Sequence, residues 1–259
     1  MRRLARILGT LLIVGGVGTL GWAVLVWQWQ DPFTAAYTKY EQHKLSGQYK
    51  RIVREYKYTP ATTAKPTPAA RAIRPMERDY KPMRETQTPS LADQRRQIAR
   101  ESRAYRSRLH EGQPFGRLKV PRLGLSIVMV NGTDGGTLTK GPGRYTGSFL
   151  PGEGELIYIA GHRTTYGAPF AHIDSMRPGD RATVELPYAT FEYVATRHVI
   201  VDGDDLSVLR SNHKELLALQ ACHPRFFASH RYIVYMKLAR VTPRDGPGYA
   251  VSGSRLIPA

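Results

Sequence analysis

Cys222 is the only cysteine among 259 residues, and it stands where the apolar run 216–221 gives way to polar residues. Arg231 begins another apolar run nine residues later, so a hairpin-like connection would bring its guanidinium beside the thiol. His162 follows a third apolar run, 156–161, and precedes a polar turn. If each run is a strand, three strand ends present a thiol, an imidazole and a guanidinium.

These three residue types together suit acyl transfer. A thiolate attacks a carbonyl carbon, an imidazole exchanges protons with the thiol and a leaving amine, and a cation stabilises the thiolate and the developing oxyanion. Spacing alone is not specific for this chemistry, because one cysteine and several histidines occur together in many proteins. A lone cysteine also fits an intermolecular link or a buried small side chain, and composition by itself favours burial.

A membrane-spanning helix is predicted near the N-terminus, within residues 1–30. No charged residue occurs in 7–29, and about 23 residues at ~1.5 Å each cover the ~30 Å hydrocarbon core. Three arginines precede this run and three tryptophans lie toward its end: Arg2, Arg3 and Arg6, and Trp22, Trp27 and Trp29. This asymmetry predicts a single-pass cell-membrane protein with a cytoplasmic N-terminus and an extracellular remainder. The alternative is a cleaved signal peptide, but the apolar run exceeds the usual ~7–15 residues.

The net charge of +17 is concentrated before the region that resembles a folded core. Residues 31–119 hold 20 Lys and Arg against 9 Asp and Glu, whereas residues 120–259 hold 15 against 12. This distribution argues against a nucleic acid as partner. Recurrent prolines beside basic residues predict that 31–114 is a linker or stalk. The stalk either binds an anionic membrane or wall polymer or is a solvated linker without a partner.

One helix is predicted within the stalk, over residues 90–109. Ser90 followed by Asp93 is typical of a helix start. The apolar stripe is thin, with Leu91, Ile98 and Tyr105 at seven-residue spacing. Both a helix packed on the following domain and a solvated helix fit this pattern.

From Phe115 onward the sequence is typical of an all-β domain, because short apolar runs alternate with Gly, Pro, Asn and Asp turns. We expect strands near 116–120, 126–131, 155–161, 181–186, 190–201, 216–221 and 231–241, and single helical turns near 137–141 and 171–176. The predicted domain therefore spans 115–241. The Gly-, Pro- and Ser-rich tail 242–259 is expected to be loosely ordered.

Three stretches in this domain resemble the sortase family. They are 159–170 (Ile-Ala-Gly-His-Arg-Thr-Thr-Tyr-Gly-Ala-Pro-Phe), 219–224 (Leu-Gln-Ala-Cys-His-Pro) and 231–235 (Arg-Tyr-Ile-Val-Tyr). The Thr-Thr-Tyr-Gly turn and the Cys-His-Pro stretch resemble those of the class E sortases of Actinobacteria. The resemblance implies an eight-stranded β-barrel with short helices. Arg144, which follows Gly143 where close relatives carry His, is expected to adjust a surface loop.

The resemblance also implies an enzyme activity and roles for six residues. The family cleaves a sorting signal between Thr and Gly and joins the Thr carbonyl to an amine of a peptidoglycan precursor or pilin lysine. Carried onto this chain, Cys222 is the nucleophile, His162 the general acid/base and Arg231 the group that orients substrate and stabilises the oxyanion. The implied substrate-binding residues are Thr165, Tyr166 and Ala221, and Tyr166 resembles the residue linked to an Ala-containing signal such as Leu-Ala-x-Thr-Gly.

Two alternatives to a sortase activity remain, and the first follows from two replaced residues just before Cys222. Sortases usually carry Thr-Leu-x-Thr before the cysteine, whereas this chain has Ala218-Leu-Gln-Ala221, without either hydroxyl. A non-catalytic scaffold with a sortase fold is one alternative. A cysteine L,D-transpeptidase is another, although that family's Ser-His-Gly-Cys stretch is missing.

No metal or other cofactor is predicted. The histidines other than His162 fit no common zinc spacing, so we expect them to be structural or solvent-facing. Asp202, Asp204 and Asp205 suggest a calcium site only if further oxygen ligands converge on them. A solvated acidic turn is favoured.

Overall fold

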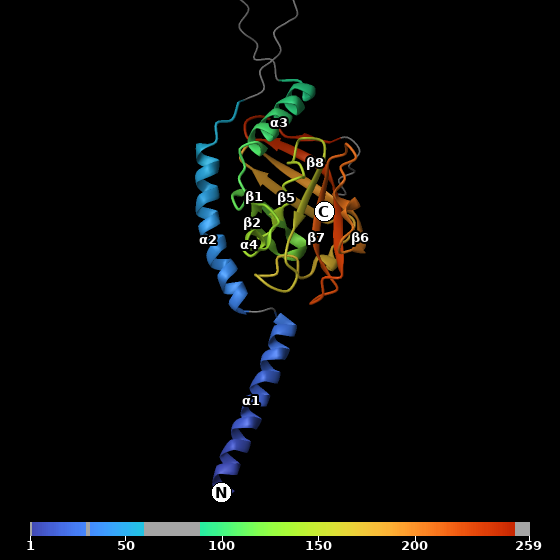
Figure 1. Cartoon of the computed structure of the whole chain (residues 1–259). Coiled ribbons are helices and arrows are strands. Elements are labelled where there is room, and N and C mark those ends of the chain that lie inside the picture. Colours follow the sequence, from blue (N-terminus) through green and yellow to red (C-terminus); the bar gives the residue numbers. More distant parts are fainter. Residues whose placement is uncertain (1, 30–31, 60–88, 252–259) are drawn as a thin grey trace, which may run out of the picture.

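The computed structural model describes residues 2–29, 32–59 and 89–251 (Figure 1). The helical segments in these ranges are α1 (Arg2–Trp29), α2 (Pro32–Glu55), α3 (Leu91–Arg106), α4 (Gly135–Leu138) and the short 3-10 turns η2 (Pro121–Leu123), η3 (Ile173–Ser175) and η4 (Leu206–Leu209). The strands are β1 (Pro114–Val120), β2 (Leu125–Asn131), β3 (Gly143–Arg144), β4 (Leu156–Ala160), β5 (Arg181–Leu186), β6 (Ala189–Asp202), β7 (Leu216–His223), β8 (His230–Pro243) and β9 (Tyr249–Ala250).

Eight of these strands close a barrel. They follow the order β6-β5-β1-β2-β3-β4-β7-β8, and β8 pairs back onto β6 along most of its length. The pairs β2–β3 and β4–β7 are parallel and the other barrel pairs are antiparallel. Closure gives each barrel strand a neighbour on both sides, although β3 pairs with only the last two residues of β2. The eight-stranded sortase-type barrel is therefore confirmed.

The barrel forms because its strands bury alternate or continuous apolar side chains. β5 and the first half of β6 alternate between buried and partly buried residues, and all five residues of β4 are buried. The largest side chains that are almost fully buried inside the barrel are Phe115, Leu118, Met129, Phe170, Tyr188, Phe191 and Tyr193. All seven predicted strands are present. The sequence missed β3 and β9, since two residues are too few to show alternation.

Arg144 is buried in β3 and does not lie in a surface loop as expected. Its Nε and Nη2 donate to Asn131 Oδ1 at 3.0 and 2.7 Å, and its Nη1 donates to the carbonyl of Ser148. Burial, followed by the charge of Arg106, lowers the pKa of Arg144 to about 10. A guanidinium carries five donors, so a ring of acceptors can satisfy it inside the protein. Arg144 thus holds together the chain segments around β3.

The segment predicted as a stalk contains a second long helix, which corrects that prediction for residues 32–55. In α2, residues 38, 42, 45, 49 and 52 recur every three or four positions and face the barrel. Leu45 and Tyr49 pack with Val128 and Val130 of β2. Figure 1 shows α2 lying along the side of the barrel. The prolines from Pro60 to Pro82, on which the stalk prediction rested, lie outside the described residues.

Helix α3 packs on the barrel, which resolves the two possibilities for residues 90–109. Ser90 caps the helix by accepting a hydrogen bond from the backbone N–H of Asp93, as the sequence predicted. Ile98 and Tyr105 join the barrel core, and the Tyr105 hydroxyl donates to the carbonyl of Phe115 at 2.9 Å. Leu91 remains exposed.

The N-terminal helix extends away from the barrel, whereas the last described residues at the C-terminal end pack on it. Helix α1 contains an apolar segment, Arg2–Val24, of mean hydropathy 1.9 that is long enough to cross a membrane and is not covered by protein. It extends away from the barrel in Figure 1. At the other end, the tail is more ordered than predicted, since β8 runs to Pro243 and Tyr249–Ala250 pairs with β8. Residues 252–259 lie outside the described residues.

Candidate functional site

Strand register brings His162, Cys222 and Arg231 together. In the parallel pair β4–β7, Ala160 lies opposite Gln220, and the N–H of the next residue, Gly161, donates to the Gln220 carbonyl at 3.0 Å. His162 and Cys222 each follow two residues after that pair. In the antiparallel pair β7–β8, Cys222 lies directly opposite Arg231. Three strand ends therefore converge as the sequence predicted.

All three side chains line one cavity of about 360 Å³. Its other lining residues include Tyr145 and Tyr158 from the barrel wall and Leu206 and Leu209 from η4. Cys222 is neither fully buried nor fully exposed and lines this cavity. A mostly apolar cleft with a few convergent polar groups is typical of a binding site.

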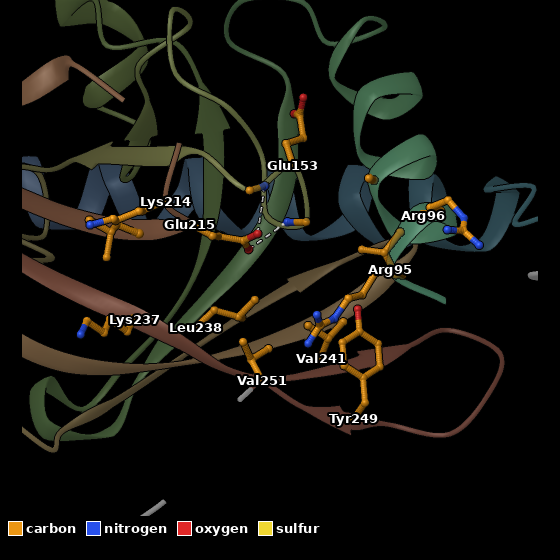
Figure 2. A pocket seen from close by; sticks show the side chains of 15 residues that line it. Arg95, Arg96, Glu153, Lys214, Glu215, Lys237, Leu238, Val241, Tyr249 and Val251 are labelled. Atoms are coloured by element: carbon orange, nitrogen blue, oxygen red, sulfur yellow. Dashed lines mark hydrogen bonds between the residues drawn. The ribbon is translucent and has the colours of Figure 1, made fainter. Parts of the chain in front are cut away.

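A larger cavity, of about 670 Å³, lies at the other end of β7 between α3, β8 and β9 (Figure 2). It is lined by neither cysteine nor histidine. Its buried carboxylate, Glu215, accepts hydrogen bonds from the N–H groups of Gly152 and Gly154 and from the Tyr193 hydroxyl. Those bonds give Glu215 a structural role. Cys222 and His162, the predicted nucleophile and base, line the smaller cavity.

His162 is held in a form suited to proton transfer. Its Nε2 is inaccessible to solvent and has no hydrogen-bond partner among the described residues. Burial lowers the pKa of His162 below 6.5, because a charged imidazole loses hydration there. The ring lies against Tyr166 with 5.0 Å between centroids. At neutral pH the imidazole is neutral and can accept a proton.

Tyr166 and Thr165 lie beside the cavity and are not part of its lining. Tyr166 has a positive φ of 53°, and its N–H donates to Thr34 Oγ1 of α2 at 2.9 Å. The Thr165 carbonyl accepts from the N–H of Ala168 at 2.9 Å, which closes the turn after His162. The structure thus places Tyr166 on the histidine and Thr165 in the supporting turn.

Arg231 is held by the loop that precedes it. Its Nη1 donates to the carbonyls of Ala228 and His230 at 2.6 and 3.0 Å. These bonds fix the guanidinium at the mouth of the β7–β8 hairpin. Its position opposite Cys222 suits a cation that stabilises negative charge near the sulfur.

Ala221 does not reach the cavity. Its side chain is fully buried in the barrel core, because successive residues of β7 point to opposite faces of the sheet. Gln220 and Cys222 face the cavity on either side of it. The Ala221 side chain therefore faces away from the cavity, and a hydroxyl at position 221 would also point into the core.

Arg163 is a component of the site that the sequence analysis missed. Its side chain is only 3% exposed, and Nη1 donates to the Cys222 carbonyl at 3.2 Å and contacts His223 Nδ1 at 2.9 Å. Nη2 forms an ion pair with Asp174 at 2.7 Å. This one side chain joins the residue after the histidine to the backbone of the cysteine. The sequence feature that could have identified Arg163 is its position directly after His162.

His223 is neutral in this arrangement. Arginine can only donate, so Nδ1 of His223 accepts and its proton resides on Nε2. Burial, and then the positive charges of Arg163 and His230, lower the pKa of His223. Its acceptor nitrogen is engaged by Arg163, so it is not available to take a proton from the thiol.

The acidic turn is organised by local bonds. Asp205 caps η4 by accepting from the N–H of Ser207, and Asp202 lies 3.4 Å from His230. In the described part of the chain, no three residues among His, Cys, Asp and Glu gather in a way that would hold a metal ion.

Comparison with known proteins matches residues 118–239 to the sortase domain. Sortase D of Bacillus subtilis is 38% identical over 135 residues, which cover 51% of this chain and 66% of the relative. Sortase SrtE1 of Streptomyces coelicolor is 27% identical over 158 residues, which cover 52% of this chain and 43% of the relative. The structure of the SrtA sortase from Actinomyces oris is 26% identical with a TM-score of 0.50, covering 57% of this chain and 92% of that one.

The family match covers most of the barrel, from Leu118 in β1 to Ala239 in β8. The chain spans just under two thirds of the length of the first relative and less than half of the second. The matched domain includes His162, Cys222 and Arg231. The chain therefore contains a sortase domain over residues 118–239.

Proposed function

We propose that this protein is a membrane-anchored cysteine transpeptidase that cleaves a sorting signal between Thr and Gly and transfers the released carbonyl to an amine. The observation that carries the proposal is the convergence of His162, Cys222 and Arg231 on one cavity at three strand ends. The match to the sortase domain supports the reaction class.

In the first half of the reaction, the Cys222 sulfur attacks the Thr carbonyl carbon. Neutral His162 takes the thiol proton, which its lowered pKa permits at neutral pH. The carbonyl oxygen becomes an oxyanion that the charge of Arg231 stabilises, while Arg231 Nη1 donates to the carbonyls of Ala228 and His230. The C–N bond then breaks, His162 returns the proton to the leaving Gly amine, and a thioester remains.

In the second half, an acceptor amine attacks the thioester. His162 removes a proton from the attacking amine, the new amide C–N bond forms, and the C–S bond breaks. The sulfur then recovers its starting protonation state. We infer that the acceptor is a peptidoglycan precursor or a pilin lysine, since both present a primary amine outside the cell.

We infer that α1 anchors the protein in the cell membrane. Its apolar segment is long enough to span, and the three arginines at its start favour a cytoplasmic N-terminus. The sortase domain then faces the outside, where sorted proteins and amine acceptors are found. The basic residues before the barrel favour contact with an anionic membrane or wall polymer, and no nucleic acid is needed to account for them.

The sorting signal is proposed to contain Ala, as in Leu-Ala-x-Thr-Gly. The Thr-Thr-Tyr-Gly turn and the relation to SrtE1 support a class E specificity, whereas the higher identity to sortase D supports a different class. Tyr166 lies on His162, where it can contact a residue of the signal. Leu-Ala-x-Thr-Gly and Leu-Pro-x-Thr-Gly peptides should therefore be compared directly.

The test incubates the purified chain with each peptide and a primary amine and follows the transpeptidation product by mass spectrometry. We expect product with at least one peptide, a thioester adduct on Cys222, and neither with Cys222→Ala. A reactive sorting-signal mimic that labels a control sortase but leaves Cys222 unmodified would exclude the proposed enzyme.

The sequence argument for a non-catalytic scaffold is weakened by the position of Ala221. It rested on Ala218 and Ala221, but the Ala221 side chain lies in the core and does not border the reacting groups. In cells, a scaffold predicts that Cys222→Ala still supports display of sorted proteins while deletion of the gene abolishes it. The enzyme predicts that both changes abolish display.

A further inference from the structure

Helix α2 lies outside the matched sortase domain, yet its first turns contact the turn that follows His162. Thr34 Oγ1 accepts the N–H of Tyr166 at 2.9 Å, and the Tyr37 ring lies edge-on to the Tyr166 ring at 6.5 Å. Tyr166 in turn lies against His162. A continuous chain of contacts therefore runs from α2 to the histidine.

The rest of α2 is attached firmly to the barrel, so these contacts come from a fixed helix. Thr38 Oγ1 donates to the carbonyl of Thr139 at 2.8 Å. The Gln42 side chain donates to the carbonyls of Val128 and Lys140 and accepts from the N–H of Val128, all within 2.9 Å. This amide extends the hydrogen bonding of β2 much as a neighbouring strand would.

The turn that α2 holds is strained. Tyr166 and Ala168 have positive φ angles of 53° and 37°, a region that residues with a side chain seldom adopt. Such conformations persist only where surrounding contacts impose them, and each costs free energy of folding. The hydrogen bond that Thr34 Oγ1 accepts is a contact of that kind, because it satisfies the N–H of Tyr166 in this conformation.

We propose that Thr34 and Tyr37 are positioning residues of the catalytic centre, which hold Tyr166 against His162 and so keep the imidazole buried and oriented. The proposal rests on the proposed transpeptidase function and extends it to a helix outside the sortase domain. Thr34 follows the end of α1 by five residues, a chain length of at most about 18 Å. The contact thus links the candidate membrane anchor to the catalytic turn.

The test uses four variants of the full-length chain in detergent. Thr34→Val removes the acceptor, Thr34→Ser keeps it, and Tyr37→Ala removes the ring that packs on Tyr166. Tyr40→Ala is the matched control, because it makes the same truncation on the same helix at a side chain that is 63% exposed.

We expect Thr34→Val and Tyr37→Ala to lower kcat/KM about tenfold, since a misplaced catalytic group costs rate without unfolding the protein. The acidic limb of the kcat/KM profile should move toward pH 6.5, because a released turn exposes His162. Thr34→Ser should stay within about twofold of the parent, and Tyr40→Ala should match it. A merely structural role would not move the pH profile or distinguish serine from valine.

The titration of His162, measured by NMR in each variant, separates this proposal from the transpeptidase itself because it needs no turnover. If the parent is active but the kcat/KM, pH profile and His162 pKa of Thr34→Val and Tyr37→Ala all match it, the positioning role is wrong. If the parent makes no product and yet Tyr37→Ala raises the His162 pKa, the transpeptidase proposal fails while the contact from α2 to the histidine stands.

Discussion

Replacing Arg163 by Met should damage the site more than it damages the fold. The side chain is 3% exposed and joins the Cys222 carbonyl, His223 Nδ1 and Asp174. Methionine fills most of the same volume but donates no hydrogen bond. The substitution therefore releases the backbone of the proposed nucleophile from the strand end that carries His162.

The size of the effect follows from these contacts. The Cys222 carbonyl is part-buried, so losing this donor should cost at most about 1–3 kcal/mol. The lost ion pair adds only about 0–1 kcal/mol, because the Asp174 side chain is half exposed and screened by water. If a comparable free energy is lost from the geometry of the transition state, kcat/KM should fall about 10- to 100-fold, at about 1.4 kcal/mol per factor of ten.

The assay compares kcat/KM for a sorting-signal peptide with the free energy of unfolding in urea, and Asp174→Asn is the control. That control removes the ion pair and keeps the bond to Cys222, so we expect less than about 1 kcal/mol of destabilisation and little loss of rate. Two results would refute the reasoning. One is a folded Arg163→Met that retains the parent rate, and the other is an Asp174→Asn variant that loses as much activity as Arg163→Met.

Three further predictions concern stability. Because burial lowers the pKa of His162 below its unfolded value of 6.5, its contribution is full above pH 6.5 and lost as pH falls toward the folded pKa. His162→Gln should therefore narrow the stability gap between pH 8 and pH 5, and an unchanged gap would contradict the assignment. Gly143→Ala places its Cβ on the carbonyl oxygen of Gly132 and should cost about 1–3 kcal/mol in urea unfolding, whereas Gly135→Ala, with open space around it, should cost little. Leu45→Ala removes a buried contact between α2 and the barrel and should cost about 2–5 kcal/mol, and a loss below 1 kcal/mol would mean that α2 is not docked in solution.

Local patterns were sufficient to predict most of the barrel. Seven strands were identified because their apolar side chains alternate or run continuously and are bounded by turn residues, and Ser90 with Asp93 located the start of α3. Two-residue strands such as β3 carry no pattern of their own. Their pairing depends on which neighbours the closed barrel brings beside them.

Helix α2 shows where interpretation of the sequence was incomplete. Its inward positions, including Leu45, Tyr49 and Ile52, follow a helical period, but charged and polar residues between them and the proline-rich segment after it favoured a linker. A helix of this composition gains most of its stability from packing against another element. The barrel surface that stabilises it is formed by residues far away in the chain.

The sequence by itself predicted the chemistry, because a thiol, an imidazole and a guanidinium stand at the ends of three apolar runs and the stretches around them resemble the sortase family. Only the tertiary structure decided which side chains support them. Arg163 reaches the Cys222 carbonyl across 59 residues of chain, and Thr34 contacts the turn after His162 across 132 residues. Ala221 points into the core. Such contacts depend on barrel closure and on the docking of α2, and neither leaves a local pattern in the sequence.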